Sequence, residues 1–379
     1  MWGGSSAGVL LVMWVLANQT AWAGPLFASS LRRMIGADRV AALEDTAYNV
    51  QDIFNRWRRV QDAPTSPWAA KDGGKAGAGN PAGAAPVVLA YHPTDVGPML
   101  KGFSADGDGV WVPAAVPGDT SGAVFKTLLH PDKDRPWTEV FLYALDVTQF
   151  SLHLVAGYQE PRAETAEARE RYRDGTPARA AIIPASDHDR LVAAFNGGFM
   201  AEHGHWGMRV DGVTVLEPKP YGCTVAMLDD GTLKIRTFSE LGPDAARVKW
   251  YRQTPPCMLE QGKMHPKLDN PDAKAWGATL SGATIIRRSA IGLDASGRTM
   301  FIALGNSTNA RALALAMAHV GAVDVAQLDV NWSYPKILFY RRSPDGGLVA
   351  EPGAPGFTFQ PGEYVNQKSN RDFFYLTRR

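Results

Sequence analysis

Two apolar runs, far apart in the chain, each end abruptly in small and polar residues. The first covers residues 191–200 (LVAAFNGGFM), and the second lies within residues 288–333, which close with LDVNWS. Such a run is typical of a buried strand whose last side chains reach a cleft. The pattern therefore predicts a sheet with a hydrophobic core, and it places the candidate site where these strands end.

Other short apolar runs predict a β-rich body. The predicted strands are 87–91, 140–146, 152–156, 191–195, 213–216, 224–228, 233–237, 284–293, 299–304, 323–329 and 337–340. Asp230-Gly231 and Ser296-Gly297 are typical of hairpin turns between such strands. The 38 glycines and 26 prolines of the chain also favour many turns.

One helix is expected inside the body. Residues 311–320 (RALALAMAHV) are apolar nearly all round, which predicts a buried helix. Ser307, Thr308 or Asn309 is suited to cap its start, and Gly321 is suited to follow its end. The strand predicted at 323–329 follows at once. The fold class is therefore α/β in a mixed α+β form, with a β-rich domain and a buried helix; residues 163–173 predict an exposed, charged helix.

Composition divides the chain into four parts. Residues 24–62 have apolar side chains at helical spacing, and residues 63–86 are rich in proline, glycine and alanine, as in a flexible linker. Residues 87–379 are expected to form the folded domain. Residues 1–23 contain an apolar run at 7–17 and the sequence Ala-Trp-Ala at 21–23, which are typical of a signal peptide and its cleavage site.

The N-terminal segment leaves alternatives open, because no lysine or arginine precedes its apolar run. Cleavage would export the protein to the periplasm or the extracellular space. An uncleaved segment would anchor it to the membrane, and a buried N-terminal helix is the third alternative. In an oxidising compartment Cys223 and Cys257 would form a disulfide; otherwise they are two buried thiols.

The net charge and the possible metal ligands of the chain limit which binding partners and cofactors are expected. The net charge of +1 argues against nucleic acid as the main partner, since nucleic-acid binding needs a basic face. The chain has no Cys-x-x-Cys, and the pair His203 and His205 has no third ligand identifiable in the sequence. No metal ion and no other cofactor is therefore expected. Either histidine could instead bind a phosphate or a sugar, and Trp206 could stack on a sugar ring.

Several residues are suited to a ligand by type and place. Asn196 ends a predicted strand, and Gly197 and Gly198 would let backbone N–H groups approach a ligand closely; the alternative is a plain Gly-Gly turn. Arg288 enters a buried run, so its charge must be paired or face a cavity, and guanidinium suits phosphate. Asp329 ends the most apolar strand, unless it only caps the next turn.

The order and spacing of these motifs resemble the phosphodiester glycosidase family over residues 86–340. The matching positions are Asn196-Gly197-Gly198-Phe199, then Arg288 with Gly292, Asp294 and Gly297, and then Leu328-Asp329. The segment 255–262 (PPCMLEQG) also resembles a family segment and adds Glu260. The resemblance implies catalytic roles for Asp329 and Glu260, and substrate binding by Asn196, Gly197, Gly198, His205, Arg288, Asn331 and Ser333.

The family hydrolyses the bond between the anomeric carbon of a sugar and a phosphodiester oxygen, so the implied partner is a glycan or phosphosugar. A carboxylate, Asp329 or Glu260, would activate water or attack the anomeric carbon. Val330-Asn331-Trp332 stands where the family has glycines, so the site is reshaped, accepts another substrate or is inactive. Three hypotheses follow: an exported hydrolase of envelope or extracellular glycans, a carbohydrate-binding protein, and a structural envelope domain tethered through residues 1–86. The hydrolase predicts that Asn196, Glu260, Arg288 and Asp329 line one cleft.

Overall fold

The computed structural model describes residues 52, 57, 63–68, 91–117, 122–172, 179–279, 282–330 and 333–379. The predictions for the signal peptide or anchor, for nearly all of the N-terminal helical segment and for most of the linker lie outside these residues. Within the described ranges, no helix has both the length and the apolar character needed to cross a membrane.

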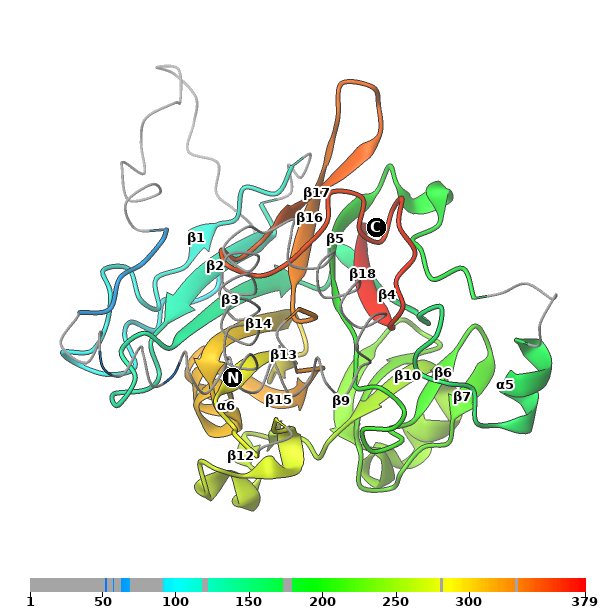
Figure 1. Ribbon diagram of the computed structural model, residues 1–379, viewed down its shortest axis with the longest axis horizontal. Coiled ribbons are helices and arrows are strands. Elements are labelled where there is room, and N and C mark those ends of the chain that lie inside the picture. The colour runs from blue at the N-terminus through cyan, green and yellow to red at the C-terminus, as the bar shows by residue number, and fades with distance from the viewer. Residues whose placement is uncertain are drawn as a thin grey trace, which may run out of the picture.

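Three antiparallel sheets form the body (Figure 1). Sheet A has the order β1-β2-β3-β14-β13-β15-β11-β12, sheet B the order β17-β16-β5-β18-β4, and sheet C the order β7-β6-β10-β8-β9. The strands of sheet A are β1 (Val112–Pro113), β2 (Val124–Leu129), β3 (Glu139–Asp146), β11 (Leu259–Glu260), β12 (Lys263–Met264), β13 (Ile286–Asp294), β14 (Thr299–Thr308) and β15 (Ala322–Gln327). Those of sheet B are β4 (Phe150–Val155), β5 (Leu191–Asn196), β16 (Ile337–Arg342), β17 (Leu348–Pro352) and β18 (Phe373–Arg378). Those of sheet C are β6 (Met208–Val210), β7 (Val213–Leu216), β8 (Cys223–Leu228), β9 (Leu233–Thr237) and β10 (Val248–Thr254).

Helix α6 (Ala310–His319) lies against sheet A. The side chain of Asn309 accepts from the backbone N–H of Ala312 and so caps α6, and Gly321 follows its end with φ 94°. Six residues of α6 are buried, which confirms the predicted buried helix. Between residues 91 and 379, the other helices of the described part of the chain are α5 (Ala166–Arg171), η1 (Ala185–Asp187), η2 (Phe238–Arg247), η3 (Pro266–Asp269) and η4 (Lys274–Trp276).

The β-rich part of the predicted fold class is confirmed, and its α/β part needs correction. The helix-then-strand order of α6 and β15 is present, but β15 runs antiparallel to both of its neighbours, β13 and β11. The reason is that β13 and β14 form a hairpin before α6 begins, so the chain re-enters the sheet beside β13 in the opposite direction. Asp329 therefore follows a central strand of an antiparallel sheet.

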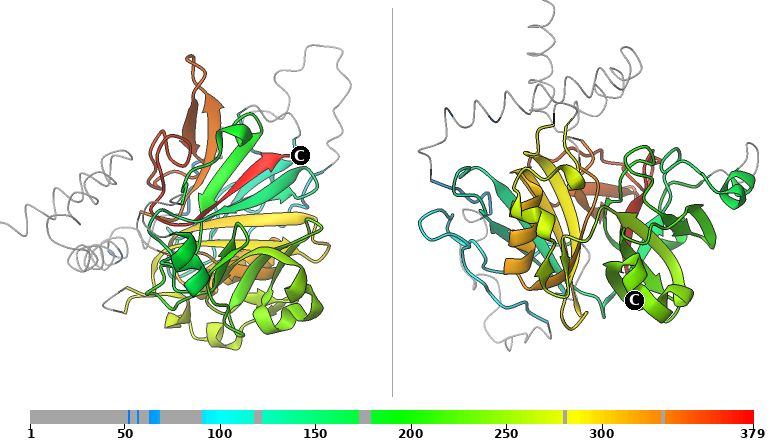
Figure 2. Two further views of the ribbon diagram at one scale, coloured as in Figure 1. Left: turned by 90° about the vertical axis from the view of Figure 1, so that its right-hand side faces the viewer. Right: turned by 90° about the horizontal axis from the view of Figure 1, so that it is seen from below.

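Figure 2 shows the three sheets from two further sides. One apolar core joins them. It contains Phe141 of β3, Phe195 of β5 and Val225 of β8, one residue from each sheet, and all three are fully buried. Trp68 lies within the predicted linker, and its ring packs against this core with its centroid 5.2 Å from that of Phe141. Side chains of all three sheets therefore meet at their junction.

Candidate functional site

The turn after β5 is buried. Asn196 is fully buried, and its side-chain amide donates to Oγ of Ser289 at 2.8 Å while its oxygen accepts from the N–H of Lys336 at 3.1 Å. The second amide hydrogen is directed to the carbonyl of Gly197 at 3.2 Å. The polar atoms of Asn196 thus connect the end of β5 with β13 and with the start of β16.

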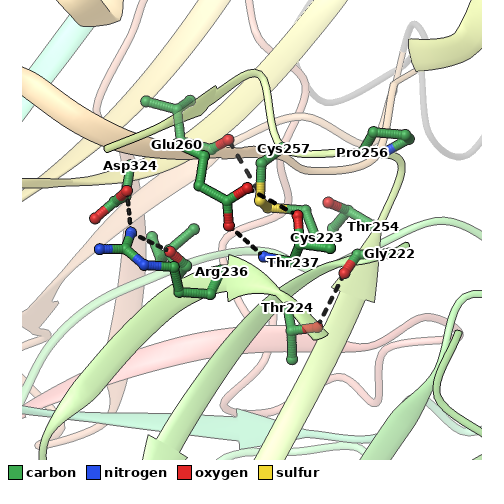
Figure 3. The surroundings of a disulfide bond; sticks show 12 residues. Gly222, Cys223, Thr224, Arg236, Thr237, Thr254, Pro256, Cys257, Glu260 and Asp324 are labelled. Atoms are coloured by element: carbon green, nitrogen blue, oxygen red, sulfur yellow. Dashed lines mark hydrogen bonds and ion pairs between the residues drawn. A yellow bond between two sulfur atoms is a disulfide. The ribbon is translucent and has the colours of Figure 1, made fainter. Parts of the chain in front are cut away.

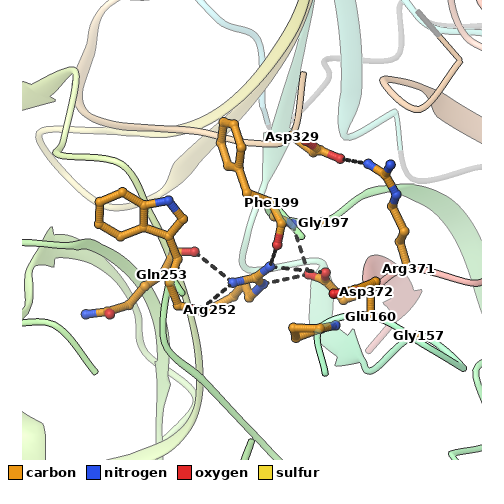
Figure 4. Close-up of polar contacts among 12 residues, drawn as sticks. Gly157, Glu160, Gly197, Phe199, Arg252, Gln253, Asp329, Arg371 and Asp372 are labelled. Carbon is orange, nitrogen blue, oxygen red and sulfur yellow. Dashed lines mark hydrogen bonds and ion pairs between the residues drawn. The ribbon is translucent and has the colours of Figure 1, made fainter. Parts of the chain in front are cut away.

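Gly197 and Gly198 are needed because a buried ion pair lies directly against them (Figure 4). The N–H of Gly197 donates to the carbonyl of Asp372 at 3.0 Å, and that of Gly198 donates to Oδ2 of Asp372 at 2.9 Å. A Cβ on Gly197 would lie 2.2 Å from Oδ2 of Asp372, and one on Gly198 would lie 2.6 Å from Cζ of Arg252. Both N–H groups are therefore engaged by the protein itself.

The ion pair itself joins sheets B and C. Nε of Arg252, on β10, donates to Oδ2 of Asp372 at 2.8 Å, and both side chains are buried. The same guanidinium donates from Nη1 to the carbonyl of Trp206 at 2.9 Å and from Nη2 to the carbonyl of Phe199. Arg252 thus fixes the segment that follows the glycine turn, as Figure 4 shows.

Asp329 lies on the other side of the same turn. Its N–H donates to the carbonyl of Gly197 at 3.0 Å, and its own carbonyl accepts from Oγ of Ser289 at 3.0 Å. Oδ1 accepts from the N–H of Val330 at 2.8 Å, and Oδ2 is paired with Nη1 of Arg371. The side chain of Asp329 is 1% exposed whereas that of Arg371 is 20% exposed, so the arginine connects the buried carboxylate with the surface.

Burial raises the pKa of Asp329 above its ordinary value, because the charged form loses its hydration. Arg371, the N–H of Val330 and His203 act in the opposite direction and favour the charged form. The guanidinium of Arg371 lies 4.7 Å from the ring centroid of Tyr334 and is held there by that stacking. A buried carboxylate beside a partly exposed cation is an arrangement that can do acid–base or nucleophilic chemistry.

The structure brings together some of the predicted residues but not others. Asn196, Gly197 and Gly198 adjoin Asp329. His205 is exposed, and its Nδ1 lies 2.8 Å from Oε1 of Glu164, which belongs to the segment before α5. Ser333 is half-buried. Asn331 lies outside the described residues.

The guanidinium of Arg288 is bound by the protein itself. It is fully buried, and its three nitrogens donate to the carbonyls of Trp276, Gly277, Thr284 and Thr308 and to Oε1 of Gln327. Neighbouring side chains of a strand point to opposite faces, so Arg288 faces away from the side on which Ser289 meets Asp329. The sequence showed correctly that this charge must be paired, but its partners are carbonyl groups.

Glu260 is also separate from Asp329. Its carboxylate accepts from the N–H of Thr237 at 2.7 Å and from the hydroxyl of Thr237 at 3.0 Å. Leu259 pairs with Val325, so Glu260 lies level with Asp324, which is within β15 and five residues before Asp329. Glu260 thus lies apart from Asp329 along β15, and the prediction that Asn196, Glu260, Arg288 and Asp329 line one cleft stays a prediction, as do the roles of the individual residues.

Three residues beside the glycine turn and Asp329 were not predicted from the sequence: Arg252, Arg371 and Asp372. Arg371 and Asp372 come directly before β18, whose run FFYL was a strand signal that could have drawn attention to them. Arg252 lies within β10, where two basic residues interrupt the apolar pattern. In the described parts of the chain, no group of three His, Cys, Asp or Glu side chains could hold a metal ion.

Comparison with known proteins finds a family model that matches part of the chain. The model of the family described as phosphodiester glycosidase matches residues 189–329, which include the glycine turn and Asp329. None of the curated proteins compared with the chain matches it. A solved structure of the zebrafish N-acetylglucosamine-1-phosphodiester alpha-N-acetylglucosaminidase catalytic domain, auto-inhibited by its pro-peptide, is similar at 14% identity over 68% of this chain and 82% of that chain, with a TM-score of 0.41. A hypothetical protein from Synechocystis is similar at 11% identity over 68% of this chain and 62% of that chain, with a TM-score of 0.39.

Proposed function

We propose, from the membership of residues 189–329 in the phosphodiester glycosidase family, that the protein is an exported hydrolase that cleaves a sugar-1-phosphodiester in envelope or extracellular glycans. The observation that carries the proposal is the buried carboxylate of Asp329, paired with Arg371 beside the glycine turn. The disulfide Cys223–Cys257 supports export, because such bonds persist in oxidising compartments. In this proposal the N-terminal segment is either removed as a signal peptide or kept as a membrane anchor.

The reaction breaks the bond between the anomeric carbon and the phosphodiester oxygen. Water supplies the oxygen that ends on the anomeric carbon, and the phosphate leaves as a monoester. The transition state resembles an oxocarbenium ion, so a negative charge beside the anomeric carbon stabilises it. Asp329 supplies that charge, and it either attacks the anomeric carbon or removes a proton from the attacking water.

The leaving phosphate needs stabilisation of its charge more than it needs a proton. Arg371 is partly exposed and suited to bind phosphate oxygens, and His203 is exposed and close enough to influence the carboxylate of Asp329. The N–H groups of Gly197 and Gly198 have no such role in this proposal, because Asp372 already engages them. Asp372 is assigned no chemistry, since its carboxylate binds Arg252 and Gly198.

A panel of sugar-1-phosphodiesters tests the proposal. Asp329→Asn should lower turnover by about a thousandfold or more while substrate still binds, because the substitution keeps the shape and removes the charge. Asp146→Asn is the matched control: Asp146 is also buried and paired with an arginine, Arg298, but it ends β3. Full activity in the Asp329→Asn variant would show that this carboxylate is structural.

A second function is a binding protein for carbohydrate or phosphosugar that does not cleave its ligand. The observation that favours it is Val330, which stands where the family has a glycine. A Cβ on Gly277 would lie only 2.7 Å from Cγ2 of Val330, so the valine side chain fills this space beside Asp329. Saturable binding of a phosphosugar without turnover by the unaltered protein would favour this function over the hydrolase.

A further inference from the structure

A cavity of about 640 Å³ lies outside the centre around Asp329. Tyr221, in the turn before β8, and Glu240, in η2, line one side of it. Glu260 and Lys263 of the β11–β12 hairpin line another side, together with Lys267. The walls therefore combine an aromatic ring, carboxylates and ammonium groups, and they come from two different sheets.

The disulfide holds these two walls together (Figure 3). Cys223 begins β8 of sheet C, and Cys257, which lines the cavity, precedes β11 of sheet A. Their Cα atoms are 4.6 Å apart. A covalent link at this position keeps the walls at a fixed separation, so a ligand need not order them on binding.

Glu260 is held in one orientation but keeps acceptor capacity. The N–H and the hydroxyl of Thr237 each bind one of its carboxylate oxygens, at 2.7 and 3.0 Å. An ionised carboxylate can accept roughly four hydrogen bonds, so further donors can be bound. Sugar hydroxyl groups are donors of this kind, and a carboxylate binds them more strongly than a neutral acceptor does.

Tyr221 is the exposed aromatic residue of the cavity. It is 55% exposed, and its ring meets that of Trp206 edge to face at 6.0 Å, which fixes its orientation. The face of an exposed tyrosine supports stacking of the apolar face of a sugar ring. Nζ of Lys219 lies 5.9 Å from the ring centroid and adds a positive charge on this side.

The cavity is also linked to the proposed reaction centre. Pro256 lines it, and the carbonyl of Pro256 accepts from Nε1 of Trp276 at 2.7 Å. Gly277 follows Trp276 and lies against Val330, the neighbour of Asp329. Glu260, which also lines the cavity, is level with Asp324 in sheet A. Asp324 comes five residues before Asp329, and five residues of extended chain span roughly 16 Å.

We infer that this cavity is a binding subsite for further sugar units of a glycan whose repeats carry phosphodiester groups. A sugar ring stacks on Tyr221, its hydroxyls donate to Glu260, and a phosphodiester lies near Lys263 and Lys267. The inference rests on the proposed function for the position of the cleaved bond, but binding at the cavity does not require catalysis. It makes the preferred substrate a polymer, since a single phosphosugar cannot reach both places.

Calorimetric titration of the full chain carrying Asp329→Asn separates the two sites. One probe is a chain of four N-acetylglucosamine-1-phosphate units joined by phosphodiesters, and the other is the methyl phosphodiester of one unit. Tyr221→Ala and Lys263→Ala should each weaken binding of the tetramer at least tenfold and leave binding of the single unit unchanged. Tyr221→Phe should keep tetramer binding, because the ring remains, and Phe103→Ala, at another exposed aromatic residue, should change neither.

Equal affinity of the tetramer for the Tyr221→Ala variant and its parent overturns the inference, and so does failure of the parent to bind the tetramer. Equal weakening of both probes also overturns it, because Tyr221 would then act through the centre at Asp329. If the unaltered protein binds the tetramer through Tyr221 but does not cleave it, the proposed hydrolase fails and the subsite stands.

Discussion

Two buried aspartates, Asp329 and Asp372, both hydrogen-bond through the backbone to Gly197 and differ in their arginine partners. Arg252, the partner of Asp372, is fully buried and also binds backbone carbonyls. Arg371, the partner of Asp329, is partly exposed. A buried, fully bonded pair can only hold the fold in place, whereas a carboxylate whose partner reaches the surface can meet a ligand.

Arg252→Met should lower the free energy of unfolding by about 3–5 kcal/mol, because it leaves the charge of Asp372 buried without its partner. Arg341→Met is the matched control: Arg341 and Glu351 form an exposed pair, worth about 1 kcal/mol or less. Denaturant unfolding measures both.

Gly198→Ala should lower the free energy of unfolding less in the Arg252→Met background than in the unaltered protein, since the added Cβ would meet the guanidinium. Simple additivity of the two changes would contradict this account of the glycine.

The pKa of Asp329 predicts the acid side of the activity profile. In the proposed reaction the carboxylate must be ionised, so kcat/KM should fall as the pH is lowered through a pKa above the ordinary value of 3.8. Arg371 lowers this pKa, so Arg371→Gln should move the acid limb to higher pH. The measurement is the pH dependence of kcat/KM for a phosphodiester substrate, with circular dichroism to check folding. An acid limb that stays in place in the Arg371→Gln variant would mean that another group controls it.

The predictable part of the site consists of residues that end an apolar run. Asn196 and Asp329 could be identified because a strand delivers each of them to a turn. The apolar run 373–376 indicates a strand directly after Arg371 and Asp372, but the sequence does not show that they pair with Asp329 and Arg252, which are distant in the chain. Arg288 shows a different limit: sequence indicates that a buried arginine needs partners, but not whether those partners are carbonyls or a ligand.

At the scale of elements, β10, which carries the missed residue Arg252, is not among the predicted strands. Runs such as 140–146 and 299–304 have few charges and were predicted near β3 and β14. β10 contains Lys249 and Arg252, and the charge of Arg252 can be buried because it pairs with Asp372 and donates to backbone carbonyls. A strand whose charged residue is neutralised by a tertiary contact has no local signal for that burial.

The disulfide confirms the predicted pairing of Cys223 with Cys257 and links two elements of different sheets. Replacing both cysteines by alanine should lower the free energy of unfolding by about 3–4 kcal/mol, because the unfolded chain is no longer constrained by a loop of this length. Thermal unfolding with and without reductant measures the effect. Reductant should destabilise the unaltered protein and leave the double variant unchanged; an equal response of both would exclude the bond.

At the scale of the whole molecule, residues 63–86 determine where the folded domain begins. The prediction that residues 87–379 fold alone rests on the composition of residues 63–86. Trp68 lies within that segment, yet its ring packs on Phe141 and Tyr143, and Nζ of Lys126 lies 4.9 Å from its centroid. A single anchored aromatic residue can add stability to a domain without being needed for it to fold.

We therefore expect a chain that begins at residue 87 to fold and to unfold cooperatively, at a slightly lower temperature than one that begins at residue 63. The lost aromatic contacts of Trp68 are worth about 1 kcal/mol, which corresponds to roughly 2–4 °C in a domain of this size. Trp68→Ala in the longer chain should reproduce the difference, since the other residues of 63–86 are expected to contribute nothing to the core.

Trypsin should cut the intact protein after Lys71 or Lys75 and leave a resistant fragment. If the chain from residue 87 does not fold, or if trypsin spares both lysines, residues 63–86 are part of the domain and the boundary lies further towards the N-terminus.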